Sequence, residues 1–266
     1  MAGLDFPRPR YAPLAIREDY MIIHSYEKGE RAEACIEYLK GVNGVGEDSR
    51  IMLLPIPSTR DKTTVLNTNI YINDALREVT AGDVVSAYGL PREFSDALRD
   101  RGVRLLQLDL DEDFLLDNAE LTALCALGIF LSSARYSPRD AKVGIVGYGR
   151  IGKRLTNLFL YLGARVRVFT SREDTRINLC EYGVASVASS SDADLSGLDI
   201  LINTAPAVIF CPEKIPKDLR VIDLASGDNF PGITVEKYPS VPAKMLPKSA
   251  GVVWGRAIER FIANNP

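Results

Sequence analysis

The sequence predicts an α/β protein of two lobes, and three observations support this prediction. Short apolar runs alternate with helix-like segments along the chain of 266 residues, a rhythm typical of βα units and parallel sheets. A glycine-rich segment, 147–152, lies between an apolar run and a helical pattern, and an apolar stretch, 119–135, separates two such series. We expect a Rossmann-type doubly wound parallel sheet plus a smaller flavodoxin-like α/β lobe, joined by a long helix and closed by a C-terminal helix.

The first lobe is expected to cover residues 1–118 as an N-terminal, substrate-side α/β domain. The segments GERAEACIEYLKG and PREFSDALRDRG have the apolar spacing of helices, and the second ends on a glycine, which commonly terminates a helix. Residues 119–138 are expected to form the connecting helix. The strands of this lobe are expected at the apolar runs 20–26, 51–57, 83–90 and 103–109.

The second lobe is expected to cover residues 139–248 as an NAD(P)-binding Rossmann domain. Its strand pattern begins at KVGIV and continues through ARVRVFT, VASVA, DILINTA and RVIDLAS, with a last strand around AKML. The final segment, 249–266, has apolar residues at helical spacing, and Ser249 is placed to cap the helix. We expect this helix to pack back toward the first lobe.

Composition and charge narrow the class of function. The hydrophobic content of 46% and the charged content of 25% are typical of a soluble globular protein. A formal net charge of -3 gives no basic field, so we expect no nucleic-acid partner. The apolar stretch 121–131 is half the length of a membrane span, and the N-terminus has no signal-peptide pattern. Separated cysteines suit reduced thiols, so we expect a cytoplasmic protein with neither a membrane nor a metal partner.

The glycine-rich segment has the spacing GxGxxG between a strand and a helix, which is the fingerprint of a dinucleotide site. Gly147 makes the tight turn, Gly149 lets the pyrophosphate approach the backbone, and Gly152 lets helix and strand pack closely. The helix that begins near Arg150 directs its free N–H groups at the phosphates. The motif consists of Gly147, Tyr148, Gly149, Arg150, Ile151 and Gly152.

The end of the next strand, at Thr170, Ser171 and Arg172, indicates which dinucleotide binds. NAD sites usually have an acidic residue here, and that carboxylate would repel a 2′-phosphate that a guanidinium would bind. NADP is the expected cofactor, and NAD stays open because Glu173 follows directly. Two later strand ends are expected to meet the same ligand through Asn203, Thr204, Ala205, Pro206, Ala225 and Ser226.

The single histidine, His24, lies in an apolar strand pattern, so the second half of the chain has no imidazole to act as a general base. This argues against 2-hydroxy-acid dehydrogenase chemistry. Cations and hydroxyls gather in two turns that are either solvated loops or a clamp for carboxylates. In the second case the substrate contacts are Ser58, Thr59, Arg60, Lys62, Lys248 and Ser249.

No catalytic residue follows directly from this pattern. The candidates are Lys248, Thr122 and Asp223, and the alternative for Asp223 and Asn203 is that they are turn or capping residues.

Taken in order, five segments resemble the A subunit of dipicolinate synthase: LLPIPSTRD, the glycine motif, INTAPAVIF, VIDLAS and YPSVPAKMLPKSAG. The resemblance implies a nicotinamide-dependent oxidation of dihydrodipicolinate to dipicolinate, at a branch of the lysine pathway in the mother cell of a sporulating bacterium. It implies that the partner is a flavoprotein-like B subunit, and we also expect a homo-oligomer. Arg60 and Lys248 would anchor the two carboxylates of the substrate.

The chain departs from this family at the start of the connecting helix. The family has a Pro-Thr-x-Glu-Gly type segment there, and this chain reads Leu121-Thr122-Ala123-Leu124-Cys125, so Leu124 replaces an acidic residue. Two other functions therefore stay open. One is another NAD(P)-dependent dehydrogenase of the 2-hydroxy-acid or amino-acid type. The other is a non-catalytic, nucleotide-binding subunit of a flavoprotein complex.

Overall fold

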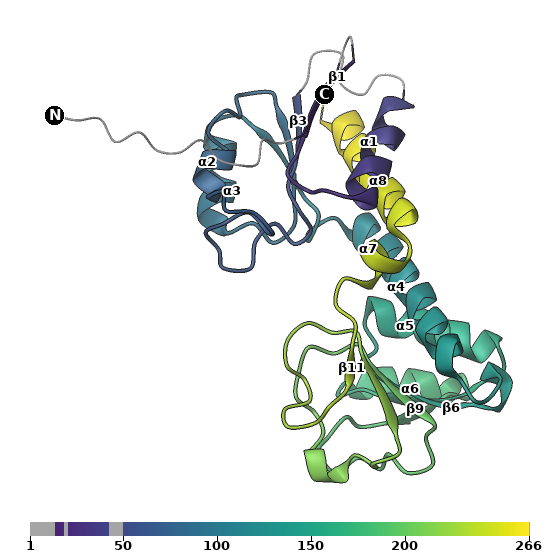
Figure 1. Ribbon diagram of the computed structural model, residues 1–266. Helices are drawn as coiled ribbons and strands as arrows, with labels where there is room; N and C mark the ends of the chain where they lie inside the picture. The colour runs from purple at the N-terminus through teal and green to yellow at the C-terminus, as the bar shows by residue number, and fades with distance from the viewer. Residues whose placement is uncertain (1–13, 19–20, 43–49, 266) are drawn as a thin grey trace. The chain divides into compact units, whose positions relative to one another are not determined.

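The computed structural model describes residues 14–18, 21–42 and 50–265 (Figure 1). Contacts between residues divide the chain into two compact units. Unit 1 consists of Met1–Leu115 and Pro247–Pro266, and unit 2 of Leu116–Leu246. Each unit is built on one β-sheet with helices, and the predicted α/β fold class is confirmed.

Unit 1 has a five-stranded sheet with the order β1-β2-β3-β4-β5. The first two strands pair antiparallel and the other neighbours pair in parallel. The parallel strands β2 to β5 lie next to one another in chain order. This order differs from the flavodoxin order 2-1-3-4-5, in which the second strand lies at the edge of the sheet. The strands are β1 Leu14–Glu18, β2 Met21–Ser25, β3 Arg50–Leu53, β4 Val84–Ala87 and β5 Arg104–Gln107.

The helices of unit 1 include two from opposite ends of the chain that lie side by side (Figure 1). A Cβ atom at Gly251 would lie 2.3 Å from the carbonyl oxygen of Arg31, and one at Gly255 would lie 2.5 Å from the ring of Tyr38, so only glycine permits this approach. Between them Trp254 is fully buried, and its Nε1 donates to Ser86 Oγ at 2.8 Å. The helices are α1 Glu30–Lys40, α2 Ile72–Ala75, α3 Arg92–Asp100 and α8 Pro247–Asn264.

Two predictions near the C-terminus are wrong. The segment expected as a last strand around AKML forms a short helix, α7 Val241–Met245, with Pro242 in its first turn. Ser249 does not cap the final helix, because α8 already begins at Pro247 and Ser249 lies inside its first turn. Proline suits the first position of a helix, since its fixed φ is helical and its missing N–H would have no partner there.

The connecting helix, α4, runs over Glu112–Ser133 and so begins earlier than expected. Asp111 explains the early start, because its Oδ1 accepts the backbone N–H of Phe114 at 3.0 Å, as an N-cap does. Among the described helices, α4 is the one long and apolar enough to cross a membrane by length and composition, a test that core helices also pass. In unit 2, buried residues of α4 such as Ala126 and Ile129 belong to the hydrophobic core.

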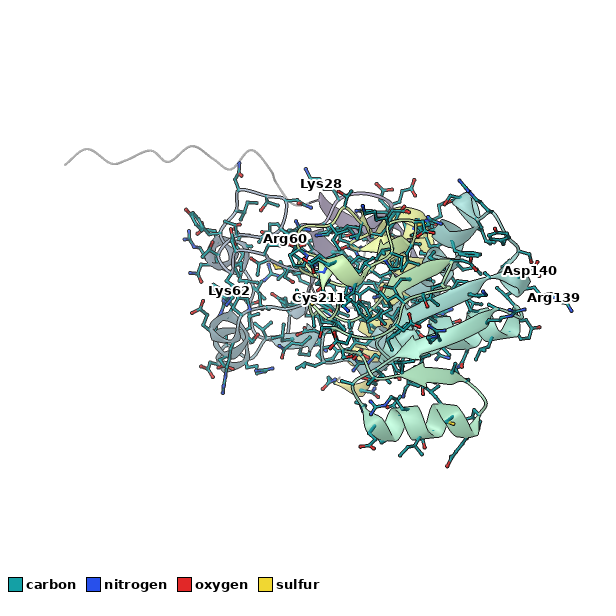
Figure 2. All side chains as sticks on the ribbon, turned by 90° about the horizontal axis from the view of Figure 1, so that it is seen from below. Lys28, Arg60, Lys62, Arg139, Asp140 and Cys211 are labelled. Atoms are coloured by element: carbon teal, nitrogen blue, oxygen red, sulfur yellow. The ribbon has the colours of Figure 1, made fainter. Side chains whose placement is uncertain are left out.

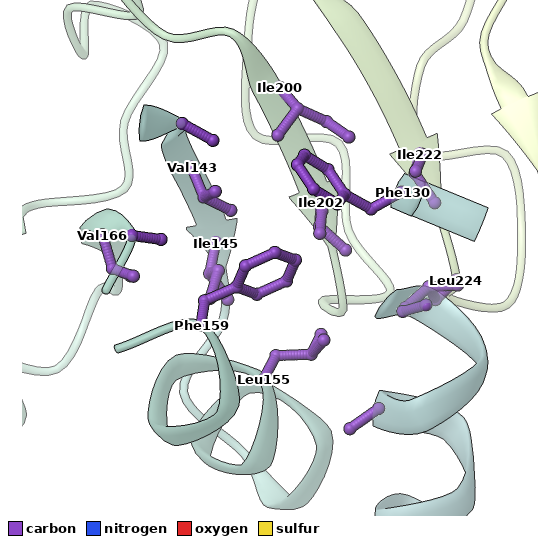
Figure 3. Packing of buried hydrophobic residues seen from close by; sticks show 14 of the residues in the cluster. Phe130, Val143, Ile145, Leu155, Phe159, Val166, Ile200, Ile202, Ile222 and Leu224 are labelled. Carbon is purple, nitrogen blue, oxygen red and sulfur yellow. The ribbon is translucent and has the colours of Figure 1, made fainter. Parts of the chain in front are cut away.

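Unit 2 has an all-parallel six-stranded sheet with the order β11-β10-β9-β6-β7-β8, which is the doubly wound order 3-2-1-4-5-6. Its core packs α4 and α5 against this sheet (Figure 3), and Phe130 and Phe159 meet edge to face with centroids 5.3 Å apart. The strands are β6 Lys142–Val146, β7 Arg165–Phe169, β8 Ala185–Val187, β9 Ile200–Asn203, β10 Arg220–Asp223 and β11 Glu236–Lys237. The helices are α5 Arg150–Tyr161 and α6 Glu173–Glu181, and the 3₁₀ turns are Pro138–Asp140 and Pro212–Lys214.

Candidate dinucleotide and carboxylate sites

The glycine motif lies at the carboxyl end of β6, next to β9, where the strand order of the sheet reverses. Two of its glycines are required by the packing of the chain itself. Gly147 has φ 87°, and a Cβ atom there would lie 2.9 Å from Thr204 Oγ1. A Cβ atom at Gly152 would lie 2.2 Å from the carbonyl oxygen of Gly147. Because neither glycine has a Cβ atom, the strand, the turn and α5 can approach one another as closely as the fingerprint requires.

Gly149 differs from both, because nothing in the chain requires a glycine there. Its φ is -81°, and a Cβ atom would meet no heavy atom within 4 Å. It is the N-cap residue of α5 and provides no side-chain hydrogen bond to the free N–H groups of that helix. The open space thus lies in front of a helix N-terminus, where the pyrophosphate of a dinucleotide binds. The residues present fit such a cofactor.

The other residues of the motif divide between core and surface. Tyr148 and Ile151 pack against the core of unit 2, and burial raises the pKa of the Tyr148 hydroxyl. The Nζ atom of Lys153 lies 5.8 Å from the centroid of the Tyr148 ring. Arg150 is exposed in the first turn of α5. The packed side chains hold the turn in place while Arg150 faces solvent at the same end.

The end of β7 brings together the residues predicted to select the cofactor. Thr170 is buried, and its Oγ1 accepts the backbone N–H of Arg172 at 3.4 Å. Arg176 donates to the carbonyl oxygens of Thr170 and Ser171, both at 3.0 Å. The exposed guanidinium of Arg172 forms an ion pair with Asp174, and this hydrogen bond is the largest cause that lowers the pKa of Asp174 to about 2. A 2′-phosphate that binds Arg172 must therefore compete with a carboxylate.

The ends of β9 and β10 are joined by a buried carboxylate. Asp223 is 1% exposed, and its Oδ1 accepts from Nδ2 of Asn203 at 2.8 Å. Its Oδ2 accepts from Nδ2 of Asn229 at 3.1 Å, and Oδ1 also accepts the backbone N–H of Ala225 at 3.2 Å. A buried carboxylate surrounded by donors fixes the loops that carry them. Asp223 thus holds the loops after both strands in position.

The predicted cofactor contacts on these loops lie around this network. Thr204 donates from Oγ1 to the carbonyl oxygen of Val146 at 2.8 Å, which ties the loop after β9 to the end of β6. Ala205 and Ala225 are half-buried, and Pro206 and Ser226 are exposed. The structure therefore gathers the predicted contacts at the carboxyl edge of one sheet, where ligands of open α/β sheets bind.

In unit 1, the loop after β3 is built around one carboxylate. Asp61 accepts the backbone N–H groups of Thr63 and Thr64, each at 2.8 Å, and the hydroxyl of Thr64 at 2.6 Å. The hydroxyl of Thr59 donates to Asp61 at 3.1 Å. These bonds, led by the Thr64 hydroxyl, hold the pKa of Asp61 well below its usual value. The ionised carboxylate of Asp61 therefore orders the loop at neutral pH.

The ordered loop exposes two cations to solvent. Arg60 and Lys62 flank Asp61, both are exposed, and neither forms an ion pair with any residue that the structure describes. Ser58 is buried instead, and its Oγ accepts the backbone N–H of Tyr88 at 2.9 Å. Of the predicted substrate contacts on this loop, the two cations are thus available to a ligand, whereas Ser58 joins β3 to β4.

The remaining predicted residues fall into two environments. Lys248 and Ser249 are exposed in the first turn of α8, within unit 1. Thr122 is buried on α4 in unit 2, where its Oγ1 donates to the carbonyl oxygen of Asn118 at 2.7 Å. The proton of this hydroxyl is therefore already engaged within the helix.

No family model matches the chain, and no curated protein matches it. Among solved structures, the A subunit of dipicolinate synthase from Bacillus halodurans has a TM-score of 0.72 at 21% identity, over 92% of this chain and 97% of that chain. The corresponding chain of dipicolinate synthase from Bacillus subtilis has a TM-score of 0.69 at 18% identity, over 94% and 98%. The chain has the fold of the dipicolinate synthase A-type proteins. The resemblance seen in the sequence is thus confirmed at the level of structure.

The fold of this chain is also similar to that of a dehydrogenase with a different substrate. A D-isomer specific 2-hydroxyacid dehydrogenase from Lactobacillus delbrueckii ssp. bulgaricus, in its NAD complexed form, has a TM-score of 0.53 at 10% identity, over 92% of this chain and 96% of that chain. At such identities the likeness establishes the fold.

Two residues that the sequence reasoning missed organise the sites. Asp61 orders the cationic loop, and Asn229 binds Asp223. The Asp-x-Thr-Thr pattern at Asp61 is a signal for a turn closed by an aspartate side chain and could have revealed it. Asn229 has no such local signal, because its partner lies six residues away across a loop.

Proposed function

We propose that this protein is a dipicolinate synthase A-type oxidoreductase that oxidises dihydrodipicolinate to dipicolinate with a bound nicotinamide dinucleotide. The observation that carries the proposal is Gly149, whose missing side chain leaves open space in front of α5 that the chain itself does not need. The dipicolinate synthase A fold supports the substrate class.

NADP is the proposed cofactor in preference to NAD. The end of β7 has no acidic residue at positions 170–172, and Arg172, Ser171 and Arg176 lie around the loop where a 2′-phosphate would bind. Arg172 would pair with that phosphate in place of Asp174. When bound, the dinucleotide supplies the hydride acceptor for the oxidation.

The substrate side of the proposal rests on the cations of unit 1. Arg60, Lys62 and Lys248 are exposed, and they suit the two carboxylates of a dihydropyridine dicarboxylate. Oxidation removes one hydride and one proton from the ring. The hydride passes to the cofactor and the proton to water, and the ring that remains is aromatic. Because aromatisation favours the product, the reaction needs a weaker base than alcohol oxidation does.

A second function, a non-catalytic nucleotide-binding subunit, is favoured by one observation. Two of the three catalytic candidates have their polar atoms engaged in structural hydrogen bonds, Thr122 with Asn118 and Asp223 with Asn203. In either case we propose a cytoplasmic homo-oligomer that works with a flavoprotein-like B subunit in the mother cell of a spore former. Light scattering of the pure chain, with and without this flavoprotein, measures both assemblies.

The deciding experiment titrates NADP and NAD into the pure chain with and without dipicolinate, and then measures NADP reduction with dihydrodipicolinate. Tighter binding of NADP, enhanced by dipicolinate, together with reduction by the chain alone, supports the oxidoreductase. Dinucleotide binding without reduction supports the non-catalytic function. Absence of dinucleotide binding contradicts both functions.

A further inference from the structure

Unit 2 contains a cavity of about 490 Å³ that lies away from the glycine motif. Its walls come from the C-terminal end of α4 and from the residues that lead into β6, β9 and β10. Because these strands are parallel, all their amino ends lie at one edge of the sheet. The glycine motif follows the carboxyl end of β6, about 16 Å away along a strand of five residues.

The floor of the cavity is apolar. Phe130, Ala141 and Ile200 line it and are at most 4% exposed. Phe130 and Ile200 belong to the hydrophobic core of unit 2 (Figure 3), and Phe130 makes an edge-to-face contact with Phe159. Such a floor binds the apolar part of a small molecule without rearrangement.

Arg220 also lines the cavity, but its charge is already compensated. Its Nε and Nη2 atoms donate to Glu236 at 2.6 and 2.9 Å. Its guanidinium also donates to the carbonyl oxygens of Ile129 and Phe130 at 3.2 and 3.4 Å. These bonds satisfy carbonyl groups near the end of α4 and fix one wall of the cavity.

Two other charges in the walls have no ion-pair partner among the residues that the structure describes. Arg135 lies just after the end of α4, and Asp218 lies just before β10. Both side chains are exposed, and although they line the same cavity they form no ion pair with each other. Asp199, before β9, has one carboxylate oxygen bound to the backbone N–H of Lys142 at 2.7 Å.

We propose that this cavity is a binding site for a small zwitterion of the α-amino acid class. Arg135 would bind the carboxylate, Asp218 and Asp199 would bind the ammonium group, and the floor around Phe130 would take the side chain. The proposal is independent of the function of the dinucleotide site.

The charges of the walls disfavour other ligands. A simple carboxylate would bind Arg135 and leave two aspartates facing its apolar part, and a simple amine would leave Arg135 without a partner. A phosphate is disfavoured further, because it carries more negative charge than a carboxylate and has no positive group for the two aspartates. A dipolar molecule satisfies both signs at once.

The test titrates L-phenylalanine, L-leucine and L-lysine into the full chain by calorimetry. We expect at least one to bind with a dissociation constant of about 1 mM or tighter. For the tightest, the analogue without the amino group and the analogue without the carboxyl group should each bind about tenfold more weakly, since each loses a charge-assisted hydrogen bond. Failure of all three to bind with a dissociation constant of about 1 mM or tighter overturns the proposal, as does equal binding of an analogue.

Variants locate the site. Arg135→Gln and Asp218→Asn should each weaken binding about tenfold, whereas Arg139→Gln, an exposed arginine outside the lining (Figure 2), should not change it. Unchanged binding in both test variants overturns the proposal. If a variant fails to fold, methyl resonances of the wild-type chain decide. Shifts of Ile200 and Ala141 on titration support the site, and shifts confined to other residues contradict it.

Discussion

Arg172 and Asp174 form a two-point ion pair at the start of α6, with Nη2 to Oδ2 at 2.7 Å and Nε to Oδ1 at 3.3 Å. Both side chains are more than half exposed. The pair therefore places a cation where the 2′-phosphate of NADP is expected, and places an anion that competes for the same cation.

Replacing the cation should separate the two dinucleotides. Arg172→Asp is expected to weaken NADP binding about tenfold or more and NAD binding little, because the new carboxylate repels only the ligand that carries a 2′-phosphate. Fluorescence titration with NADPH and NADH measures both. Equal losses for the two would contradict the assignment of NADP.

Replacing the competing anion should have the opposite effect. Asp174→Asn is expected to tighten NADP binding about two- to fivefold, which is the range for an exposed ion pair, and Glu173→Gln is the matched control. Bonding to Arg172 lowers the pKa of Asp174 to about 2. The negative charge of Asp174 is therefore fully present above the ordinary pKa of an aspartate, and it is lost only as the pH falls toward 2. The gain should therefore be constant between about pH 7 and 8, where Asp174 is fully ionised and the 2′-phosphate, whose second pKa is about 6, carries both negative charges. A gain that varies across this range would point to another titrating group.

The glycines of the motif should respond differently to substitution. Gly149→Val is expected to abolish dinucleotide binding and leave the melting temperature nearly unchanged, because a Cβ atom there meets no atom of the chain. Gly152→Ala should destabilise unit 2 by about 1–3 kcal/mol, since its Cβ would lie 2.2 Å from a carbonyl oxygen. Thermal unfolding and NADPH titration of both variants test this. Retained binding in Gly149→Val would place the pyrophosphate elsewhere.

The cationic loop should affect the substrate alone. Arg60→Ala is expected to raise the KM for a dicarboxylate about tenfold and leave the dissociation constant of the cofactor unchanged, because one charge-assisted hydrogen bond is lost. Arg77→Ala, an exposed arginine that is paired with Asp74, is the control. Steady-state kinetics together with cofactor titration distinguish the two parameters. A defect in cofactor binding alone would remove Arg60 from the substrate site.

The buried carboxylate should act mainly on stability. Asp223→Asn retains the shape of the side chain but places an amide against the amides of Asn203 and Asn229. We expect a loss of about 1–3 kcal/mol in the free energy of unfolding, measured by denaturant titration. A variant of unchanged stability with a strongly reduced kcat would instead identify Asp223 as a catalytic base.

Much of the fold could be predicted, because the buried parallel strands are continuous apolar runs bounded by turn residues. β6, β7, β9 and β10 all lie within predicted runs. Val241–Met245 could not be assigned in this way, because so short an apolar segment fits a strand as well as a helix. The proline at Pro242 was the signal that favoured a helix start.

The parts of the site that consist of a local sequence motif could be predicted. The parts that depend on tertiary contacts between side chains could not. The glycine motif and the Arg172 region are each a short continuous stretch of sequence, and the structure places each at the expected strand end. The pairing of Arg172 with Asp174, and of Asp223 with Asn229, depends on side-chain directions that spacing does not reveal. The cavity near Arg220 joins elements about ninety residues apart, and no local pattern marks it.

The packing of α8 on α1 has a consequence for biosynthesis. Unit 2 is one continuous segment, whereas unit 1 needs residues from both ends of the chain. The last pieces of unit 1, around Gly251 and Gly255, leave the ribosome only after the whole of unit 2. Until then the face of α1 that carries the backbone of Arg31 and Cys35, against which Gly251 packs, lacks its partner helix. During synthesis, unit 2 can therefore complete its fold before unit 1, which still lacks α8.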